Sequence, residues 1–200
     1  MLLKYFPYET RVITYLKSSE GRHMKIKNLL AFAVALLAVV AVKAQESTLP
    51  RKVENVTIMD INGTPSQLPQ YGEKNLLIFY VDPDSYLKGG ANKKLSDELE
   101  ENGRAAGSAI RGFGVMNFPD TGLPKNMVRN MARKRAAKNG ATILDDDQQI
   151  LKKAWGLGDC NNKFVIMIVS KEGELVYCAK EDLDEAGIQN FYEVVEKYRN

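Results

Sequence analysis

A nearly continuous apolar run from Leu76 to Val81 constrains the fold of this chain more than any other stretch. A strand that shows one face to water alternates apolar and polar residues, whereas a strand covered on both faces does not. The run therefore predicts a central strand with both sheet faces covered. Phe164 to Val169 is a second apolar run, and Leu175 to Cys178 follows it after Lys171-Glu172-Gly173, which predicts an antiparallel hairpin.

Helical patterns alternate with these strands. Apolar residues at helical spacing predict helices over 91–102, 123–139, 148–157 and 188–198, and shorter strand patterns cover 53–61, 115–118 and 141–144. Strands that alternate with helices and end in a hairpin plus a helix imply an α/β fold, with a mixed sheet flanked by helices on both faces. We expect one domain over 53–200, with 45–52 as a flexible lead-in.

Residues 25–44 have the three-part pattern of a secretory signal peptide. A basic start precedes the apolar stretch from Leu29 to Val42, and small residues lie just before Gln45. This stretch is 14 residues long, short of the roughly 20 that cross a bilayer. We therefore expect cleavage near Ala44/Gln45, no transmembrane anchor afterwards, and a periplasmic or secreted protein.

Met24 directly precedes this pattern, so we expect 1–23 to be an upstream start artefact and 24–44 to be the leader. Residues 1–44 hold seven of the 28 Lys and Arg and two of the 25 Asp and Glu, so the chain from residue 45 carries 21 basic and 23 acidic side chains, a net charge of −2. Nucleic-acid binding by bulk charge loses its support. The sole histidine, His23, is also removed, which excludes Ser-His-Asp, Cys-His and imidazole–zinc sites.

The stretch ILDDDQQILKKAWGLGDCNNKFVIMIVSKEGELVY, residues 143–177, resembles the second half of periplasmic thioredoxin-fold proteins. An acidic turn, a short helix ending in an aromatic residue and glycine, and a K-E-G hairpin recur there. More narrowly, GVMNFPDTGLPKNMVRNMARKRAAKNGATILDDD followed by AWGL resembles the YtfJ family of periplasmic proteins. The resemblance covers residues 53–198 and implies a thioredoxin-like fold, with no established activity to transfer.

In redox-active thioredoxins the loop after the second core strand carries Cys-x-x-Cys, where the helix N-terminus lowers the pKa of the first thiol. The resemblance places Asp82-Pro83-Asp84-Ser85 at that loop. Because no cysteine is present, it implies that dithiol exchange by the usual route is excluded. The usual proline before the fourth strand is also missing, and Cys160-Asn161-Asn162-Lys163 takes its place.

Our first hypothesis is therefore a non-catalytic binding or accessory protein of the cell envelope, with an unidentified protein or small-molecule partner. Its surface is expected where one loop, with Asp82, Asp84 and Ser85, opposes another, with Cys160, Asn161 and Asn162. Neighbouring aspartates can share a proton or hold a cation, but Asp82 is more simply a helix cap. We expect no cofactor and no metal, because three consecutive aspartates at 145–147 cannot all converge on one ion, and we expect Asp147 to cap the next helix.

The alternative is a thiol oxidoreductase or peroxide-reacting enzyme that uses Cys160, resolved by Cys178. A hairpin centred on Glu172 pairs Cys178 with Ile166 and leaves Cys160 about 20 Å away if extended, whereas a disulfide needs Cα atoms about 4.4–6.8 Å apart. Two reduced thiols are therefore expected. Cys160 is a candidate for chemistry if it is exposed beside the Asp82 loop.

The basic helix 125–138 carries a third hypothesis. Lys125, Arg129 and Arg133 share one helix face, which could dock an anionic lipid, a phosphate or an acidic partner. The other interpretation is a solvated face whose charge is offset by the acidic turn at 145–147, and we favour it.

Overall fold

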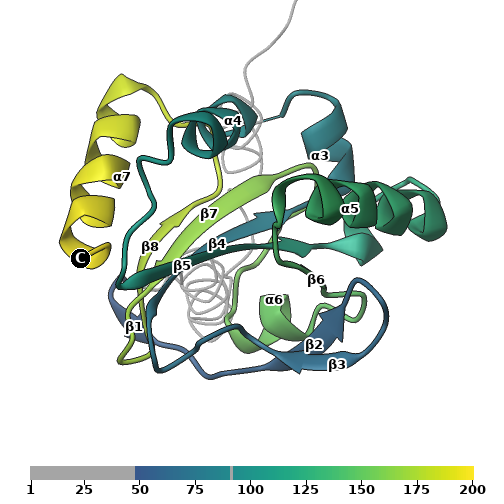
Figure 1. Ribbon diagram of the computed structural model, residues 1–200, viewed down its shortest axis with the longest axis horizontal. Helices are drawn as coiled ribbons and strands as arrows, with labels where there is room; N and C mark the ends of the chain where they lie inside the picture. The colour runs from purple at the N-terminus through teal and green to yellow at the C-terminus, as the bar shows by residue number, and fades with distance from the viewer. Residues whose placement is uncertain (1–47, 91) are drawn as a thin grey trace, which may run out of the picture. The chain divides into compact units, whose positions relative to one another are not determined.

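Eight strands form one mixed sheet in the computed structural model, which describes residues 48–90 and 92–200 (Figure 1). Their order across the sheet is β1-β8-β7-β4-β5-β6-β2-β3. The bounds are β1 (Arg51–Lys52), β2 (Thr57–Asp60), β3 (Pro65–Gln67), β4 (Asn75–Val81), β5 (Ile110–Met116), β6 (Ile143–Asp145), β7 (Phe164–Val169) and β8 (Glu174–Ala179). The expected start artefact, the leader and residues 45–47 of the lead-in lie outside the described residues.

Helices cover both faces of this sheet, and Figure 1 shows α4, α5 and α7 on one side with α6 on the other. They are α3 (Pro83–Leu87), α4 (Lys93–Asn102), α5 (Lys125–Asn139), α6 (Ile150–Ala154) and α7 (Glu185–Tyr198), with a short 3-10 helix, η1 (Phe118–Asp120). Glycines in the left-handed region end α4 and α5, at Gly103 and Gly140, because only glycine adopts that conformation without cost.

The predicted central strand is confirmed. β4 runs parallel to β5 and antiparallel to β7, and every residue of β7 is buried. Alternate side chains of β4 enter two cores: Ile78 packs with Leu151 and Trp155 of the α6 side, and Leu77 packs with Phe191 of the α7 side. Each fully buried side chain of this kind contributes roughly 1.5–3 kcal/mol, so the strand is stabilised from both faces.

Some element bounds differ from the sequence expectation. β5 begins at Ile110, whereas the sequence predicted a start at residue 115. The first half of the strand was not predicted because Gly112 and Gly114 interrupt its apolar pattern. Arg51–Lys52, expected in the lead-in, forms an edge strand paired with β8. The chain enters the short helix α3 directly after β4, with only Asp82 between them. Pro65–Gln67 forms a further strand, β3, beside β2.

The predicted hairpin is present, but the expected pairing of Cys178 with Ile166 is wrong. Cys178 pairs with Met167, because the register shifts by one residue between Ile168 and Val169. Such a bulge inserts one unpaired residue and cannot be seen in a symmetric count from the turn.

The described strands and helices belong to one compact unit, Thr48–Asn200. Among residues 48–90 and 92–200, no helix has the length and apolarity needed to cross a membrane.

Candidate functional site

The loop after β4 and the loop before β7 meet, as expected from the sequence, and Asp82 joins them. Asp82 is the N-cap of α3, and its Oδ1 accepts a hydrogen bond from the N–H of Asp84 at 2.9 Å. Its Oδ2 accepts one from the N–H of Asn162 at 2.7 Å. Burial raises the pKa of the Asp82 carboxyl above its ordinary value, although these two N–H groups act in the opposite direction. The predicted capping role is confirmed.

The six predicted binding residues are not equally accessible at this edge. Asp82, Ser85 and Cys160 are buried, and the Ser85 Oγ has no hydrogen-bond partner within the described part of the chain. Asp84 is half-buried and accepts hydrogen bonds from Thr121 and Gly122. Asn161 and Asn162 are exposed. Ligand binding by these loops stays a prediction, and a ligand arriving there meets mainly the two asparagines.

Cys160 lies in the core beneath that edge instead of at its surface. Its exposed fraction is 0%, and burial raises the pKa of its thiol to about 11, against a smaller opposing effect of Lys152 and Lys180. Cys178 packs against the same core, and no disulfide joins the two. A thiol that is inaccessible and protonated at neutral pH is a poor nucleophile.

The three consecutive aspartates at the end of β6, Asp145, Asp146 and Asp147, have two roles. Asp146, rather than the expected Asp147, stands at the start of α6, where it accepts the N–H groups of Ile150, Leu151 and Lys152. It also accepts the Tyr80 hydroxyl at 3.0 Å. The prediction for Asp147 is therefore wrong, because Asp146 is buried beside these N–H groups, whereas Asp147 is half-buried and pairs with Lys125.

The other two carboxylates of this turn neutralise the basic helix face. Arg129 donates from Nε and Nη2 to Asp145 Oδ2 at 2.9 and 2.7 Å, and its Nη2 lies 3.5 Å from Asp147 Oδ2. Lys125 pairs with Asp147, and Arg133 donates to the carbonyl of Ile61 at 2.9 Å. The favoured interpretation of a face offset by the acidic turn is confirmed for Lys125 and Arg129. In the described ranges, no group of three or more His, Cys, Asp or Glu is placed to hold a metal ion.

A groove that the sequence did not predict lies on the sheet between α4 and α5, with a volume of about 870 Å³. Its floor is formed by Phe79 of β4 and by Gly112 and Gly114 of β5. Gly112 is exposed although β5 is an inner strand. A Cβ added at Gly112 would meet no atom within 4 Å, and one at Gly114 would meet nothing closer than 3.9 Å. The two missing side chains therefore create the hollow.

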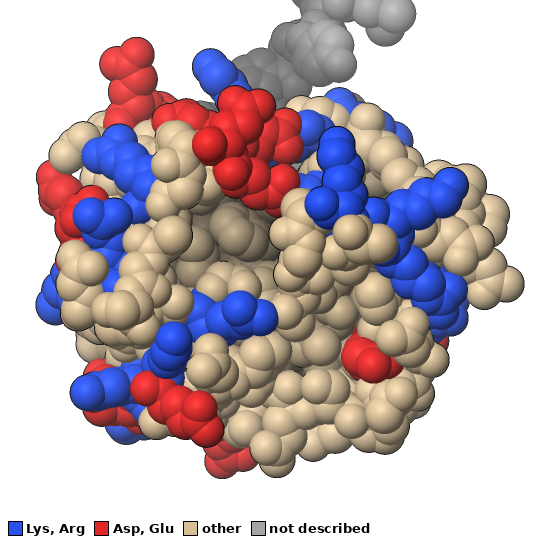
Figure 2. Space-filling model, in the orientation of Figure 1, with Lys and Arg blue, Asp and Glu red and all other residues tan. Residues whose placement is uncertain are grey.

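The walls of the groove are apolar and its rims are charged with opposite signs. Val128, Met131 and Ala132 of α5 line one side, and the Met131 side chain remains exposed although it is large and apolar. Figure 2 shows a hollow with acidic side chains gathered over α4 and basic ones over α5. Pockets of roughly 300–1,000 Å³ with mostly apolar walls and a few polar groups are typical small-molecule sites.

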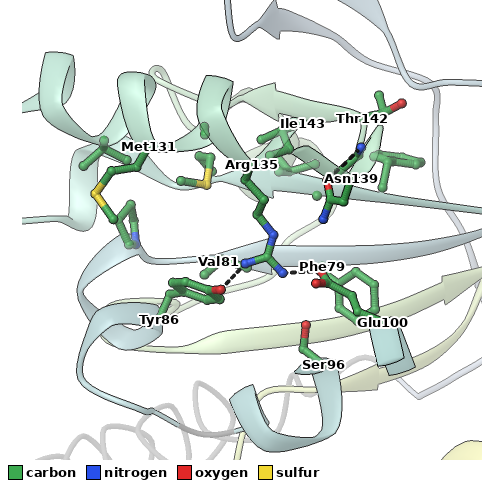
Figure 3. Close-up of a pocket in the computed structure, with 18 of the residues that line it drawn as sticks. Phe79, Val81, Tyr86, Ser96, Glu100, Met131, Arg135, Asn139, Thr142 and Ile143 are labelled. Carbon is green, nitrogen blue, oxygen red and sulfur yellow. Dashed lines mark hydrogen bonds and ion pairs between the residues drawn. The ribbon is translucent and has the colours of Figure 1, made fainter. Parts of the chain in front are cut away.

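Arg135 extends from α5 across this groove (Figure 3). Its Nη1 donates to the Tyr86 hydroxyl and its Nη2 to the Glu100 carboxylate, from α3 and α4 respectively. The guanidinium lies 4.9 Å from the centroid of the Tyr86 ring. Burial alone lowers the pKa of Arg135, but Glu100 and Tyr86 raise it above its ordinary value, so the groove contains a permanent cation.

A signal for this groove is visible in the sequence only in hindsight. Gly112 and Gly114 are two residues apart, so in a strand they share one face. Glycine inside a strand often marks a close approach of a ligand or another backbone. Arg135 gives no such signal, because it stands among other basic residues of α5.

No protein-family model and no curated protein sequence matches the chain. Solved structures match it, among them an exposed lipoprotein thioredoxin (Etrx1) of Streptococcus pneumoniae, with 17% identity, a TM-score of 0.51, and coverage of 70% of this chain and 99% of that one. A putative thioredoxin of Neisseria meningitidis has 12% identity, a TM-score of 0.52, and coverage of 72% and 89%.

A thioredoxin-family thiol:disulfide interchange protein of Chlorobium tepidum also matches, with 9% identity, a TM-score of 0.51, and coverage of 77% of this chain and 99% of that one. Identities this low are informative about fold alone. Together with the mixed sheet and its flanking helices, they show that the chain has a thioredoxin-like fold.

Proposed function

We propose that this chain is a non-catalytic binding protein on a thioredoxin-like fold, and that its ligand is a small molecule with an apolar body seated in the groove over β4 and β5. One observation carries the proposal: Gly112 is exposed on an inner strand of the sheet, with open space above it. An inner strand is normally covered, because water on an apolar face forfeits the stabilisation of burial. A ligand on that floor supplies the missing cover.

The properties of Cys160 favour binding over thiol chemistry. Thiol and peroxide enzymes need an accessible thiolate, whereas this sulfur is buried and its pKa is raised to about 11. The basic helix is less suited to docking an anionic surface, since Arg129 and Lys125 are already paired with the acidic turn.

We further propose that the protein works in the bacterial cell envelope and is related to the YtfJ family. The signal-peptide pattern of residues 25–44 and the motifs of 114–177 support this. Amino-terminal sequencing of protein recovered from the producing cell provides the test, and the presence of any of residues 1–43 would contradict cleavage near Ala44/Gln45.

Filling the groove tests the binding proposal. Gly112→Leu places an apolar side chain in open space, so the variant is expected to fold normally and, with the glycine entropy cost removed, to be as stable as the parent or up to about 1 kcal/mol more stable. Nile red, a neutral apolar dye, should bind the parent at one saturable site with a rise in fluorescence. Gly112→Leu should weaken that binding at least about tenfold, because the leucine occupies the floor.

Ala137→Leu is the matched control. Ala137 is exposed on α5 and does not line the groove. The substitution therefore adds a leucine side chain outside the groove. Equal dye binding by all three proteins, or loss in the control as well, would count against the groove as the site. Dye binding that rises with protein concentration through a dimer would instead assign the groove to a second copy of the chain.

A further inference from the structure

The geometry points to a ligand that is an amphiphile with a carboxylate head, which Arg135 binds while the apolar chain lies on the floor of the groove. This inference rests on the proposed function and adds the ligand's chemical class to it. It also assigns a role in specificity to one side chain.

The position of Arg135 is the first step. The Arg135 side chain is 27% exposed, while that of its partner Glu100 is 47% exposed. The cation is therefore the enclosed member of the pair and the carboxylate is the member at the rim. Figure 3 shows the guanidinium directed across the groove from α5, with Tyr86 and Glu100 opposite it.

The existing pair with Glu100 shows that Arg135 binds a carboxylate. The guanidinium is planar and suits carboxylate oxygens, and its hydrogen bonds to them are assisted by charge. Ion pairs at the protein surface add little net stability, and the Glu100 side chain is about half exposed. An incoming carboxylate can therefore replace Glu100 as the acceptor of the Nη2 hydrogen bond at a small cost in free energy. Tyr86 meanwhile keeps its hydrogen bond to Nη1, and its ring stays beside the guanidinium.

The floor accepts the apolar part of such a ligand. Phe79 and Gly112 are shared with a second hollow of about 310 Å³, lined also by Leu77 and Leu99. The groove is thus longer than the segment beside Arg135, and an extended chain that begins at the guanidinium can continue over Phe79 and Gly112. Apolar contact along this path provides the affinity, and the arginine selects the head.

A cationic head is selected against. If such a head paired with Glu100, it would leave the enclosed Arg135 without its carboxylate, which is costly for a partly desolvated charge. Lys134 and Lys138 also line the α5 wall and add repulsion. A neutral head keeps the existing ion pair but gains nothing from it.

Isothermal titration calorimetry with three twelve-carbon amphiphiles tests this selection. The probes are dodecanoate, dodecyl maltoside and dodecyltrimethylammonium, each below its critical micelle concentration. We expect dodecanoate to bind at least about tenfold more tightly than the other two, because its carboxylate pairs with Arg135 inside the groove, where the pair is stronger than the more solvated pair with Glu100 that it replaces.

Substitutions at the ion pair give opposite effects. Arg135→Gln should weaken dodecanoate at least about tenfold and leave the maltoside unchanged, and Arg135→Lys should weaken it less. Glu100→Gln should strengthen dodecanoate several-fold, because the competing internal carboxylate is gone. If the Arg135–Glu100 pair only stabilised the fold, Glu100→Gln would not strengthen dodecanoate binding. Lys171→Gln, an exposed lysine outside the groove, is the charge-matched control.

The outcomes separate the two proposals. Equal binding of the three amphiphiles to the parent, or retained dodecanoate preference in Arg135→Gln, overturns the carboxylate inference while apolar binding stands. If none of the three amphiphiles binds and Nile red binding is unchanged in Gly112→Leu, both the carboxylate inference and the proposed binding function are overturned. Unfolding of each variant in urea, followed by circular dichroism, confirms that a lost signal is not a loss of fold.

Discussion

At the scale of single residues, Asp82 is a structural link at the place where redox-active thioredoxins carry a reactive thiol. One carboxylate satisfies the N–H of Asp84 and the N–H of Asn162, which lies 80 positions further along the chain. Loss of one such hydrogen bond costs about 0.5–1.5 kcal/mol. The side chain therefore holds two loops together, and its complete burial keeps it out of reach of a ligand.

Cys160 provides the residue-scale prediction. In Cys178→Ala, Cys160 is the sole thiol of the chain. Near pH 7.5 we expect dithionitrobenzoate to react with the native variant at least about a hundredfold more slowly than with the urea-unfolded chain, because a pKa of about 11 and complete burial leave almost no accessible thiolate.

Cys160→Ala, which retains Cys178, is the matched control for this measurement. It calibrates the reagent against a half-buried thiol of the same core. Rapid native modification of Cys160 would restore the thiol-enzyme hypothesis and would remove the main argument against it.

At the scale of elements, α6 depends on its capping residue more than a longer helix does. It has five residues, too few to be stable alone, and Asp146 satisfies three of its free N–H groups. The same carboxylate accepts the buried hydroxyl of Tyr80. The pKa of that phenol is raised by burial and by the neighbouring Asp146, so Tyr80 stays a neutral donor.

Substitution of neighbouring aspartates separates the cap from the surface pair. Asp146→Ala should lower the free energy of unfolding by about 2–4 kcal/mol, the combined cost of a lost cap and an unsatisfied buried hydroxyl. Asp147→Ala should cost less than about 1 kcal/mol, because its partners are partly solvated. Urea denaturation followed by Trp155 fluorescence measures both, and equal losses would show that the assignment of the cap is mistaken.

At the scale of the whole described unit, two cores lie on opposite faces of one sheet and share its strands. Trp155 and Leu151 belong to the α6 side, and Phe191 and Val195 belong to the α7 side. Neither core can be exposed without loosening β4 and β7, which contribute to both. Such an arrangement favours a single cooperative transition.

Two probes that report on opposite faces test this cooperativity. Trp155 is the only tryptophan and reports on the α6 side, while far-ultraviolet circular dichroism reports mainly on α4, α5 and α7. In urea we expect coincident transitions with a common slope of about 1–3 kcal/mol per molar. A fluorescence change that clearly precedes or follows the helix signal would mean that the two faces unfold separately.

Much of the fold followed from local patterns. The run Leu76 to Val81 indicated a strand covered on both faces, and the K-E-G turn indicated the terminal hairpin. The helices ended at Gly103 and Gly140, where glycine is free to adopt the left-handed conformation. These features depend on residues within one element, so periodicity and capping chemistry suffice to predict them.

Tertiary structure alone decided the rest. Three consecutive aspartates do not reveal which one caps α6, because the pairing of Met116 with Asp145 sets that choice. Arg135 meets Glu100 and Tyr86, which lie 35 and 49 positions away, only after three helices pack on the same sheet face. The groove arises from the side chains that Gly112 and Gly114 lack, and an absence becomes a cavity only when neighbouring elements enclose it.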